Sequence, residues 1–248
     1  MNDLSETINK AADLVHRLTG PLCDDIGAMI SDRMKPYRAK NLVNSFRKTE
    51  RILREACLPA NAVPARLLFP IVEACSIEDD ETLQEMWAGL LATASQQTGS
   101  VSPSFIETLR QLAPDDARHL EIVCQESVKH YNQVTERSRY LSKNVDMKDR
   151  ICDGMTLAPW AFGGATSRAE SKEFDVPPNV YPDTYVRLGL IRRDYGVSGS
   201  VYKREILNGY YDEVDRHQEV NAEVDSWYEF TEYAVRFLDA CHGPLPAG

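Results

Sequence analysis

The stretch Arg66–Ser95, RLLFPIVEACSIEDDETLQEMWAGLLATAS, constrains the fold more than any other part of this 248-residue chain. Its apolar residues recur at helical spacing on both sides of an acidic corner, which predicts two helices packed against each other. In the corner, Asp79 or Asp80 can accept hydrogen bonds from free backbone N–H groups, and Glu81 adds negative charge where the helix dipole favours it. Trp87 lies in the apolar stripe of the second helix. We therefore expect all four of these residues to be structural.

Helical patterns continue on both sides of this helix pair. Residues 3–18 predict an amphipathic helix with mixed charge on its polar face. Residues 22–57 predict one long helix or two helices bent near Pro36. After the pair, two more helices follow, each with a proline in its first turn. Successive helices joined by short loops predict a helical bundle over residues 1–131.

The last part of the chain has a different character. Residues 132–177 mix charged residues with glycine and proline, so we expect a linker or insertion there. Residues 178–248 predict a short helix over 181–189, strands over 190–195 and 201–207 around a turn at 196–199, and a final helix after Thr231. This order resembles a winged helix. The predicted fold class is therefore mainly α, an N-terminal helical bundle with a small C-terminal winged-helix-like α+β domain.

A basic surface is the most unusual electrostatic feature of a chain whose formal net charge is −10. Between Arg33 and Arg54 there are eight basic residues and one acidic residue. Arg33, Lys40, Arg47 and Arg54 recur every seven residues and so share one helix face, with Arg51 nearby. This face suits a phosphate backbone, an acidic protein partner or anionic lipid. The alternative is that it pairs with acidic helices of its own fold, the acidic corner included.

Two further surfaces are candidates for partners. The other side of the basic helix carries a coiled-coil-like seam suited to a homodimer, formed by Leu42, Phe46, Thr49, Leu53 and Ala56. Residues 181–248 hold seven Lys or Arg against twelve Asp or Glu, which disfavours nucleic-acid binding by the winged-helix-like part. Only Arg192-Arg193 with Lys203-Arg204 can form a small basic spot there. A protein-interaction or dimerisation module fits this part better.

No catalytic constellation stands out in the sequence. It contains no Walker loop, GxGxxG, GxSxG or HExxH motif, and its five histidines and six cysteines are scattered without metal-binding spacing. We therefore expect no metal, no cofactor and no enzymatic activity. Scattered cysteines at apolar positions are typical of a reduced, cytoplasmic protein, and the N-terminus lacks the pattern of a secretory signal. The longest apolar runs fall far short of the ~20 residues that a membrane span needs.

The sequence LLFPIVEACSIEDDETLQEMWAGLLATAS, followed by VSPSFIETLRQLAPDDARHLE, resembles the Abi-alpha family, a bacterial family associated with abortive infection. The resemblance runs from about Gly20 to Glu121 and returns near the C-terminus. It implies antiphage defence and implies no reaction. We therefore predict a cytoplasmic defence protein that binds protein partners, a second copy among them, rather than an enzyme. The alternatives are a nucleic-acid-binding regulator that uses the basic helix face, and a membrane-acting toxin, for which no sufficiently long apolar helix is present.

Overall fold

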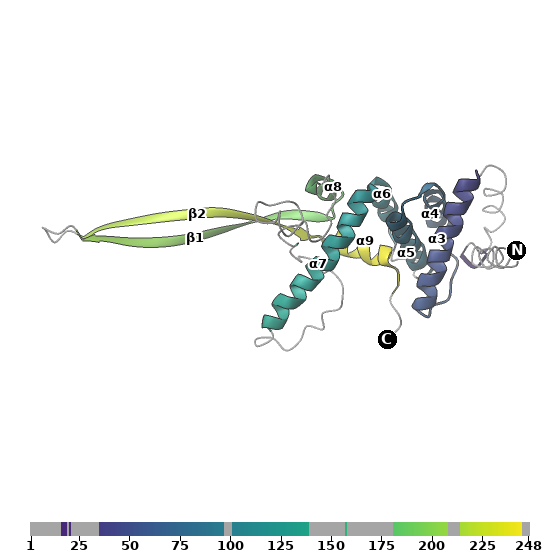
Figure 1. The fold of residues 1–248 in the computed structure, drawn as a ribbon, viewed down its shortest axis with the longest axis horizontal. Helices are drawn as coiled ribbons and strands as arrows, with labels where there is room; N and C mark the ends of the chain where they lie inside the picture. The colour runs from purple at the N-terminus through teal and green to yellow at the C-terminus, as the bar shows by residue number, and fades with distance from the viewer. Residues whose placement is uncertain are drawn as a thin grey trace.

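The computed structural model of the chain describes residues 16–18, 20, 35–96, 101–138, 157, 181–207 and 214–244. These residues form the following elements: α3 (Pro36–Glu55), α4 (Ala65–Ile77), α5 (Glu81–Gln96), α6 (Pro103–Gln111), α7 (Pro114–Ser138), α8 (Pro182–Arg187), β1 (Ile191–Leu207), β2 (Val214–Phe230) and α9 (Glu232–His242). Figure 1 shows the helices gathered in one body, from which the two strands project. The predicted mainly α fold class is confirmed, with a two-stranded antiparallel sheet near the C-terminus. The winged-helix assignment and the predicted domain limits stay predictions.

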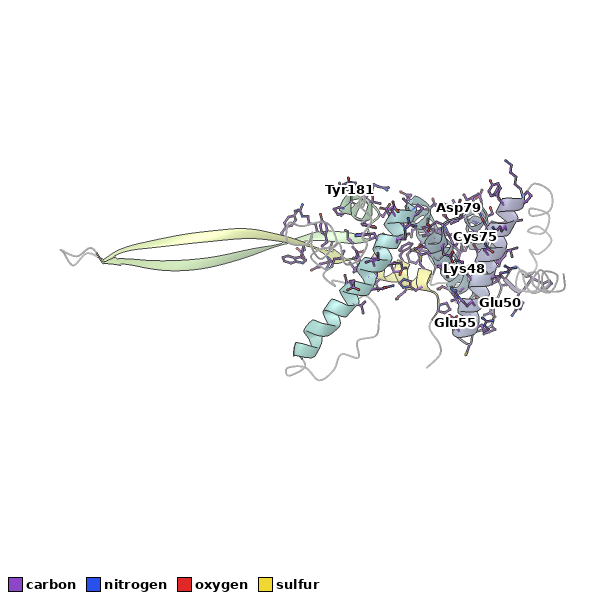
Figure 2. All side chains as sticks on the ribbon, viewed as in Figure 1. Lys48, Glu50, Glu55, Cys75, Asp79 and Tyr181 are labelled. Carbon is purple, nitrogen blue, oxygen red and sulfur yellow. The ribbon has the colours of Figure 1, made fainter. Side chains whose placement is uncertain are left out.

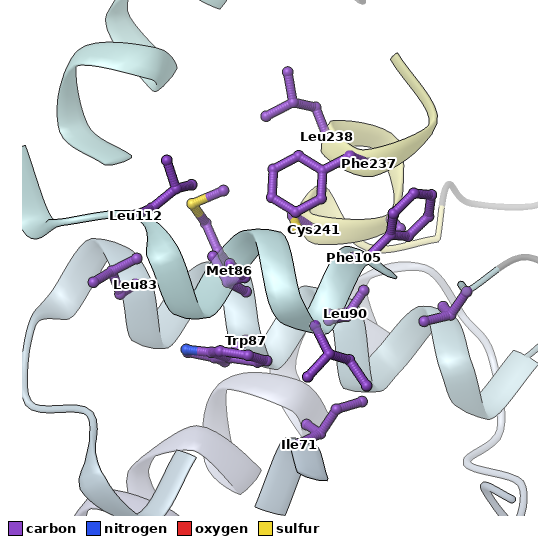
Figure 3. Packing of buried hydrophobic residues seen from close by; sticks show 14 of the residues in the cluster. Ile71, Leu83, Met86, Trp87, Leu90, Phe105, Leu112, Phe237, Leu238 and Cys241 are labelled. Atoms are coloured by element: carbon purple, nitrogen blue, oxygen red, sulfur yellow. The ribbon is translucent and has the colours of Figure 1, made fainter. Parts of the chain in front are cut away.

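The central helix is α5, which packs against α3, α4, α6, α7 and α9. Most of its residues are buried, because they are apolar or small around most of the helix circumference. Trp87 is 2% exposed and belongs to the hydrophobic core. In Figure 3, Leu90 points toward Ile71 of α4, while Met86 lies on the opposite side of α5, where Cys241 of α9 also lies. The predicted helix pair is therefore α4 and α5, and its second helix is the centre of the core.

Helix α3 begins at Pro36, with Lys35 as its N-cap residue, and a proline is favoured at this first helical position. The residues before Lys35, except 16–18 and 20, lie outside the described residues, and with them Arg33 and most of the predicted helix at 3–18. The predicted seam is buried within the chain, at Leu42, Phe46, Thr49, Leu53 and Ala56. Because α3 packs against α4 and α5, these side chains are not available to a second copy.

The last helix, α9, lies directly against α5 at Gly89. A Cβ atom at Gly89 would stand 1.7 Å from the carbonyl oxygen of Cys241, so only glycine permits this approach. One turn further along α5, the Thr93 hydroxyl donates a hydrogen bond of 2.9 Å to the carbonyl oxygen of Ala240. This bond satisfies one of the carbonyl groups that a helix leaves free at its C-terminal end. The C-terminal helix therefore shares one hydrophobic core with the helices of the N-terminal part.

Helix α7 is longer than the sequence predicted. It continues to Ser138, into the region expected to be linker. The segment HYNQVTERS contains no glycine or proline, and its Gln, Glu and Arg favour a helix. It lacks the apolar periodicity that marks a helix buried in a core, which is why the pattern did not reveal it. Apart from 157, residues 139–180 of the predicted linker lie outside the described residues.

The strands form one long hairpin, and here the predicted turn at 196–199 is wrong. β1 and β2 pair without interruption from Ile191↔Phe230 to Leu207↔Val214, and residues 196–199 stand opposite residues 222–225. Glycine and serine favour a turn only in the absence of a stronger alternative. The partner strand supplies that alternative because it continues as an alternating, valine-containing segment opposite the glycines.

Thr231 joins the hairpin to the helical body. Its side-chain oxygen accepts a hydrogen bond of 3.0 Å from the N–H of Ala234 and so caps α9. Its hydroxyl donates a bond of 2.5 Å to the carbonyl oxygen of Gly189, the residue with a φ of 72° that follows α8. Glycine adopts this left-handed conformation without steric cost, which fits its predicted place at the end of that helix. A single side chain thus holds the end of α8 to the start of α9.

Candidate functional site

The basic residues of α3 divide into two groups. The first group is engaged within the fold: Lys48 and Arg51 are neutralised by carboxylates of α5, while Arg38 donates hydrogen bonds of 3.1 and 2.6 Å to the uncharged hydroxyl of Ser76. The second group, Lys40, Arg47 and Arg54, is exposed. Among the residues that the structure describes, no side chain makes an ion pair or hydrogen bond with any of these three. We call Lys40, Arg47 and Arg54 the outer basic stripe.

The neutralised group connects α3 to α5. The Lys48 ammonium lies 2.9 Å from carboxylate oxygens of both Glu81 and Glu85, and its side chain is only 13% exposed (Figure 2). The Arg51 guanidinium lies 2.5 Å from the second oxygen of Glu85 and 3.9 Å from Glu55. The hydrogen bond from Lys48 lowers the pKa of Glu81. This half of the predicted basic face, Arg51 included, therefore follows the alternative of pairing with the protein's own acidic residues.

The outer basic stripe has a regular geometry. Its members are seven residues apart, so successive charges lie about 10.5 Å apart along the helix axis. They sit on nearly one line because seven residues are close to two full turns. Arg33 would extend this line but lies outside the described residues. The stripe is a row of three positive charges facing solvent on a protein that is acidic overall.

The acidic corner before α5 caps that helix. Asp80 Oδ1 accepts hydrogen bonds of 3.0 and 3.1 Å from the N–H groups of Thr82 and Leu83, and Asp80 Oδ2 pairs with Arg118 at 2.7 Å. The Glu78 carboxylate accepts bonds from the N–H groups of Asp79 and Asp80. Burial raises the pKa of Glu78. The carboxylates of Asp80 and Glu78 are therefore engaged with backbone N–H groups, as in a structural helix start.

A pocket of about 560 Å³ opens beside the corner, between α3, α5, α7 and α9. Its lining residues are Arg51, Ile52, Glu55, Glu81, Thr82, Glu85, Met86, Arg118, Glu121, Ile122, Gln125, Cys241 and His242. The sequence analysis did not predict this pocket, because its walls come from four helices that are far apart in sequence. The one sequence feature that could have indicated the pocket is the polar row Arg118, Glu121 and Gln125 on α7. By itself, this row looks like a solvated helix face.

The chemistry of this pocket does not favour a cysteine nucleophile. Burial raises the pKa of the Cys241 thiol well above its usual value, and the nearby Glu121 raises it further. The Glu121 carboxylate lies 2.8 Å from Nε2 of His242. A reactive cysteine needs the opposite environment, one that stabilises the thiolate. Burial likewise raises the pKa of Cys75 to about 12 and that of Cys124 well above normal.

The basic spot predicted on the hairpin is partly neutralised. Arg192 pairs with Glu229, its register partner on β2, at 2.9 Å. The guanidinium of Arg193 lies over the rings of Tyr195 and Tyr228, at 5.3 and 5.9 Å from their centroids. The structure therefore places Arg192 and Arg193 in contacts within the hairpin itself. The side chains of the other predicted pair, 203–204, lie outside those described.

The described residues also bear on metal binding and on membrane insertion. Among these residues, no three His, Cys, Asp or Glu side chains are grouped so that they could hold a metal ion. No helix in the described part of the chain has both the length and the apolar character needed to cross a membrane.

Comparison with known proteins gives one match. The family model described as "Abortive infection alpha" matches residues 38–241. The match spans the outer basic stripe, the acidic corner, α5, the hairpin and most of α9. No curated protein and no solved structure matches the chain.

Proposed function

Because this chain belongs to the abortive infection alpha family, we propose that it is a cytoplasmic antiphage defence protein that acts by binding rather than by catalysis. The family supports abortive infection as the setting. The observation that carries the binding mode is the outer basic stripe, Lys40, Arg47 and Arg54. The binding proposal is supported by the state of the other reactive groups: the described buried thiols have raised pKa values, and the corner carboxylates cap a helix.

The stripe favours an acidic protein partner. Three cations in a row attract a matching row of carboxylates on a partner helix or strand, and such pairs set the orientation and the rate of association. The neighbouring Lys48 and Arg51 are held by α5, so the stripe has a rigid base. A partner that binds there does not have to break an existing ion pair of Lys40, Arg47 or Arg54, since none is formed among the described residues.

The test is the double charge reversal Lys40→Glu with Arg47→Glu. Its matched control is Arg66→Glu with Arg236→Glu, which makes the same change in net charge at two exposed arginines away from the stripe. We expect the stripe variant to lose protection against phage in a plating assay and to lose its partner in affinity purification from infected cells. The control should keep both. Full protection by a folded stripe variant would contradict the proposal.

The alternative function is a nucleic-acid-binding regulator that uses the same stripe. The 10.5 Å spacing leaves room for phosphates, and the test is the salt dependence of binding to duplex DNA, for which three phosphate contacts give a slope of about −2.7 in log K against log salt. A steep slope that is lost in the stripe variant would favour this alternative over a protein partner. Absence of binding at low salt would favour the protein partner.

A further inference from the structure

The hairpin of β1 and β2 is an arm whose two edges meet no third strand among the described residues. Each strand is 17 residues long, about 55 Å at the usual rise per residue. Among the described residues each strand has only the other as its strand partner. An isolated two-stranded ribbon is marginally stable in water, and open edges are templates for another strand. Figure 1 shows the arm extending away from the helical body, so its outer part lies away from the described helices.

The two edges of the arm are not equivalent. On the β2 edge, the carbonyl oxygen of Tyr228 accepts a hydrogen bond of 2.9 Å from the N–H of Leu157, so this edge is covered near the body. On the β1 edge, the N–H of Tyr195 donates a hydrogen bond of 2.8 Å to the side chain of its neighbour Asp194. Arg193 is the register partner of Tyr228, and in an antiparallel ladder the outward-facing residues alternate. The odd-numbered residues of β1 therefore direct their backbone groups outward.

The sequence of β1 is complementary to itself when two copies run antiparallel. Its centre, VSGSV, is the same in both directions around Gly199. Antiparallel pairing joins residues whose backbone groups both face outward, so Gly199 of one copy can stand opposite Gly199 of the other. In that register Asp194 stands opposite Arg204, and Arg193 opposite Glu205. Twofold symmetry repeats both pairs, which gives four opposite-charge pairs across the new edge.

The neighbouring register of the same β1 edge lacks this complementarity. A shift of β1 by one permitted step, with its centre at Ser198, places Arg192 opposite Arg204 and Arg193 opposite Lys203. Like charges directly opposite each other are unfavourable.

The β2 edge is no better suited to pair with itself. Self-pairing of β2 around Ala222 places Asp215 opposite Glu229 and Glu219 opposite Asp225, again like charges. Among these self-pairings, the charges favour the β1 edge and the register centred on Gly199.

We propose that β1 pairs with β1 of a second copy of this chain, around a twofold axis at Gly199, to form a continuous four-stranded sheet. The antiparallel arrangement places the base of each arm beside the tip of the other. The two helical bodies then lie at opposite ends of the sheet, about 55 Å apart, and do not compete for space. This interface does not involve the outer basic stripe, so the inference is independent of the proposed function.

The first test is the mass of the full chain by light scattering and sedimentation. We expect a dimer for the unaltered chain and a monomer for Gly199→Pro, because proline removes an outward-facing N–H without removing a bond between β1 and β2. The matched control is Ala222→Pro, the register partner of Gly199 on the β2 edge, which should remain dimeric. If the unaltered chain is still a monomer at about 100 µM, its dissociation constant is higher than that of a specific complex, and the proposal is overturned. Undiminished dimerisation of Gly199→Pro would overturn it as well.

A charge exchange keeps the proposal testable if both prolines disturb the hairpin. Asp194→Arg alone and Arg204→Asp alone each convert an opposite-charge pair into a like-charge pair at two symmetric places. Each single change should weaken the dimer about 10- to 100-fold. The combined variant restores both pairs and should recover dimerisation. Failure of the combined variant to recover, or single variants with unchanged affinity, would show that this register is wrong. Circular dichroism checks that all variants remain folded.

Discussion

The helical body and the arm differ in how far their polar groups find hydrogen-bond partners within the described chain. In the body, Ser127 Oγ is the one buried side-chain nitrogen or oxygen without a hydrogen-bond partner among the described residues. Caps and ion pairs between helices serve the others, as at Asp80 and Lys48. The arm has two strands, and among the described residues no third strand pairs with either of them. The difference is that the described body satisfies nearly all of its buried polar side chains, whereas the described strands of the arm pair only with each other.

The largest expected effect is a loss of stability caused by a substitution at the contact between α5 and α9. Gly89→Ala places a Cβ atom where the carbonyl oxygen of Cys241 now stands, and backbone cannot yield as a flexible side chain can. We expect a loss of about 3 kcal/mol in the free energy of unfolding, measured by urea titration. The control Thr82→Ala, at the start of the same helix, should stay within about 0.5 kcal/mol. An unchanged midpoint for Gly89→Ala would show that α9 does not pack as described.

The next effect concerns the joint between the body and the arm. Thr231→Ala removes the cap of α9 and the bond to Gly189, and should cost about 1 kcal/mol. Thr231→Ser keeps the hydroxyl and serves as the matched control, with most of the stability retained. Thermal unfolding followed by circular dichroism measures both. Equal losses in the two variants would assign the role to the methyl group instead of the hydroxyl.

A smaller effect distinguishes the neutralised basic residues from the outer basic stripe. Lys48→Met should lower the urea midpoint by about 0.3 M at pH 7, since Lys48 pairs with two carboxylates. Arg47→Met, the adjacent exposed residue, should leave the midpoint unchanged.

The same comparison has a pH dependence with a defined sign. Lys48 lowers the pKa of Glu81 in the folded protein, so its stabilisation is present above the ordinary carboxyl pKa. It is lost as the pH falls through the lowered pKa. The midpoint difference between Lys48→Met and the unaltered chain should therefore be full at pH 7 and shrink toward zero in acid. A difference that grows in acid would contradict the pairing.

The smallest effect concerns thiol reactivity, with stability unchanged. It tests whether α9 stays packed against the other helices of the body. In a chain whose other cysteines are replaced by serine, the buried thiols Cys75, Cys124 and Cys241 should not react with a thiol reagent at pH 8, because burial raises their pKa values. Unfolding in urea should release three thiols per chain. Rapid reaction of one thiol, with the other two protected, would indicate that α9 opens independently of the helices around α5.

How much of the molecule the sequence predicted depends on how local each feature is. The helix pair around the acidic corner, the apolar α5 and the final helix after Thr231 were predictable, because capping residues and apolar periodicity are local signals. The turn at 196–199 was predicted wrongly, because glycine and serine gave a local signal that pairing with β2 overrides. The pocket between α3, α5, α7 and α9 was missed, because none of its walls is complete on one helix.

By itself, the sequence determined that this protein is mainly helical, that a helix pair is built around the acidic corner and that α3 carries a basic face. Only the tertiary structure decided which basic residues remain available, since Lys48 and Arg51 find carboxylates 33 and 34 residues away while the outer basic stripe finds none among the described residues. It also decided that α9 packs against α5 at Gly89. The physical reason is the same in both cases. Periodicity fixes the face on which a residue lies, but its partner is set by how distant elements cross.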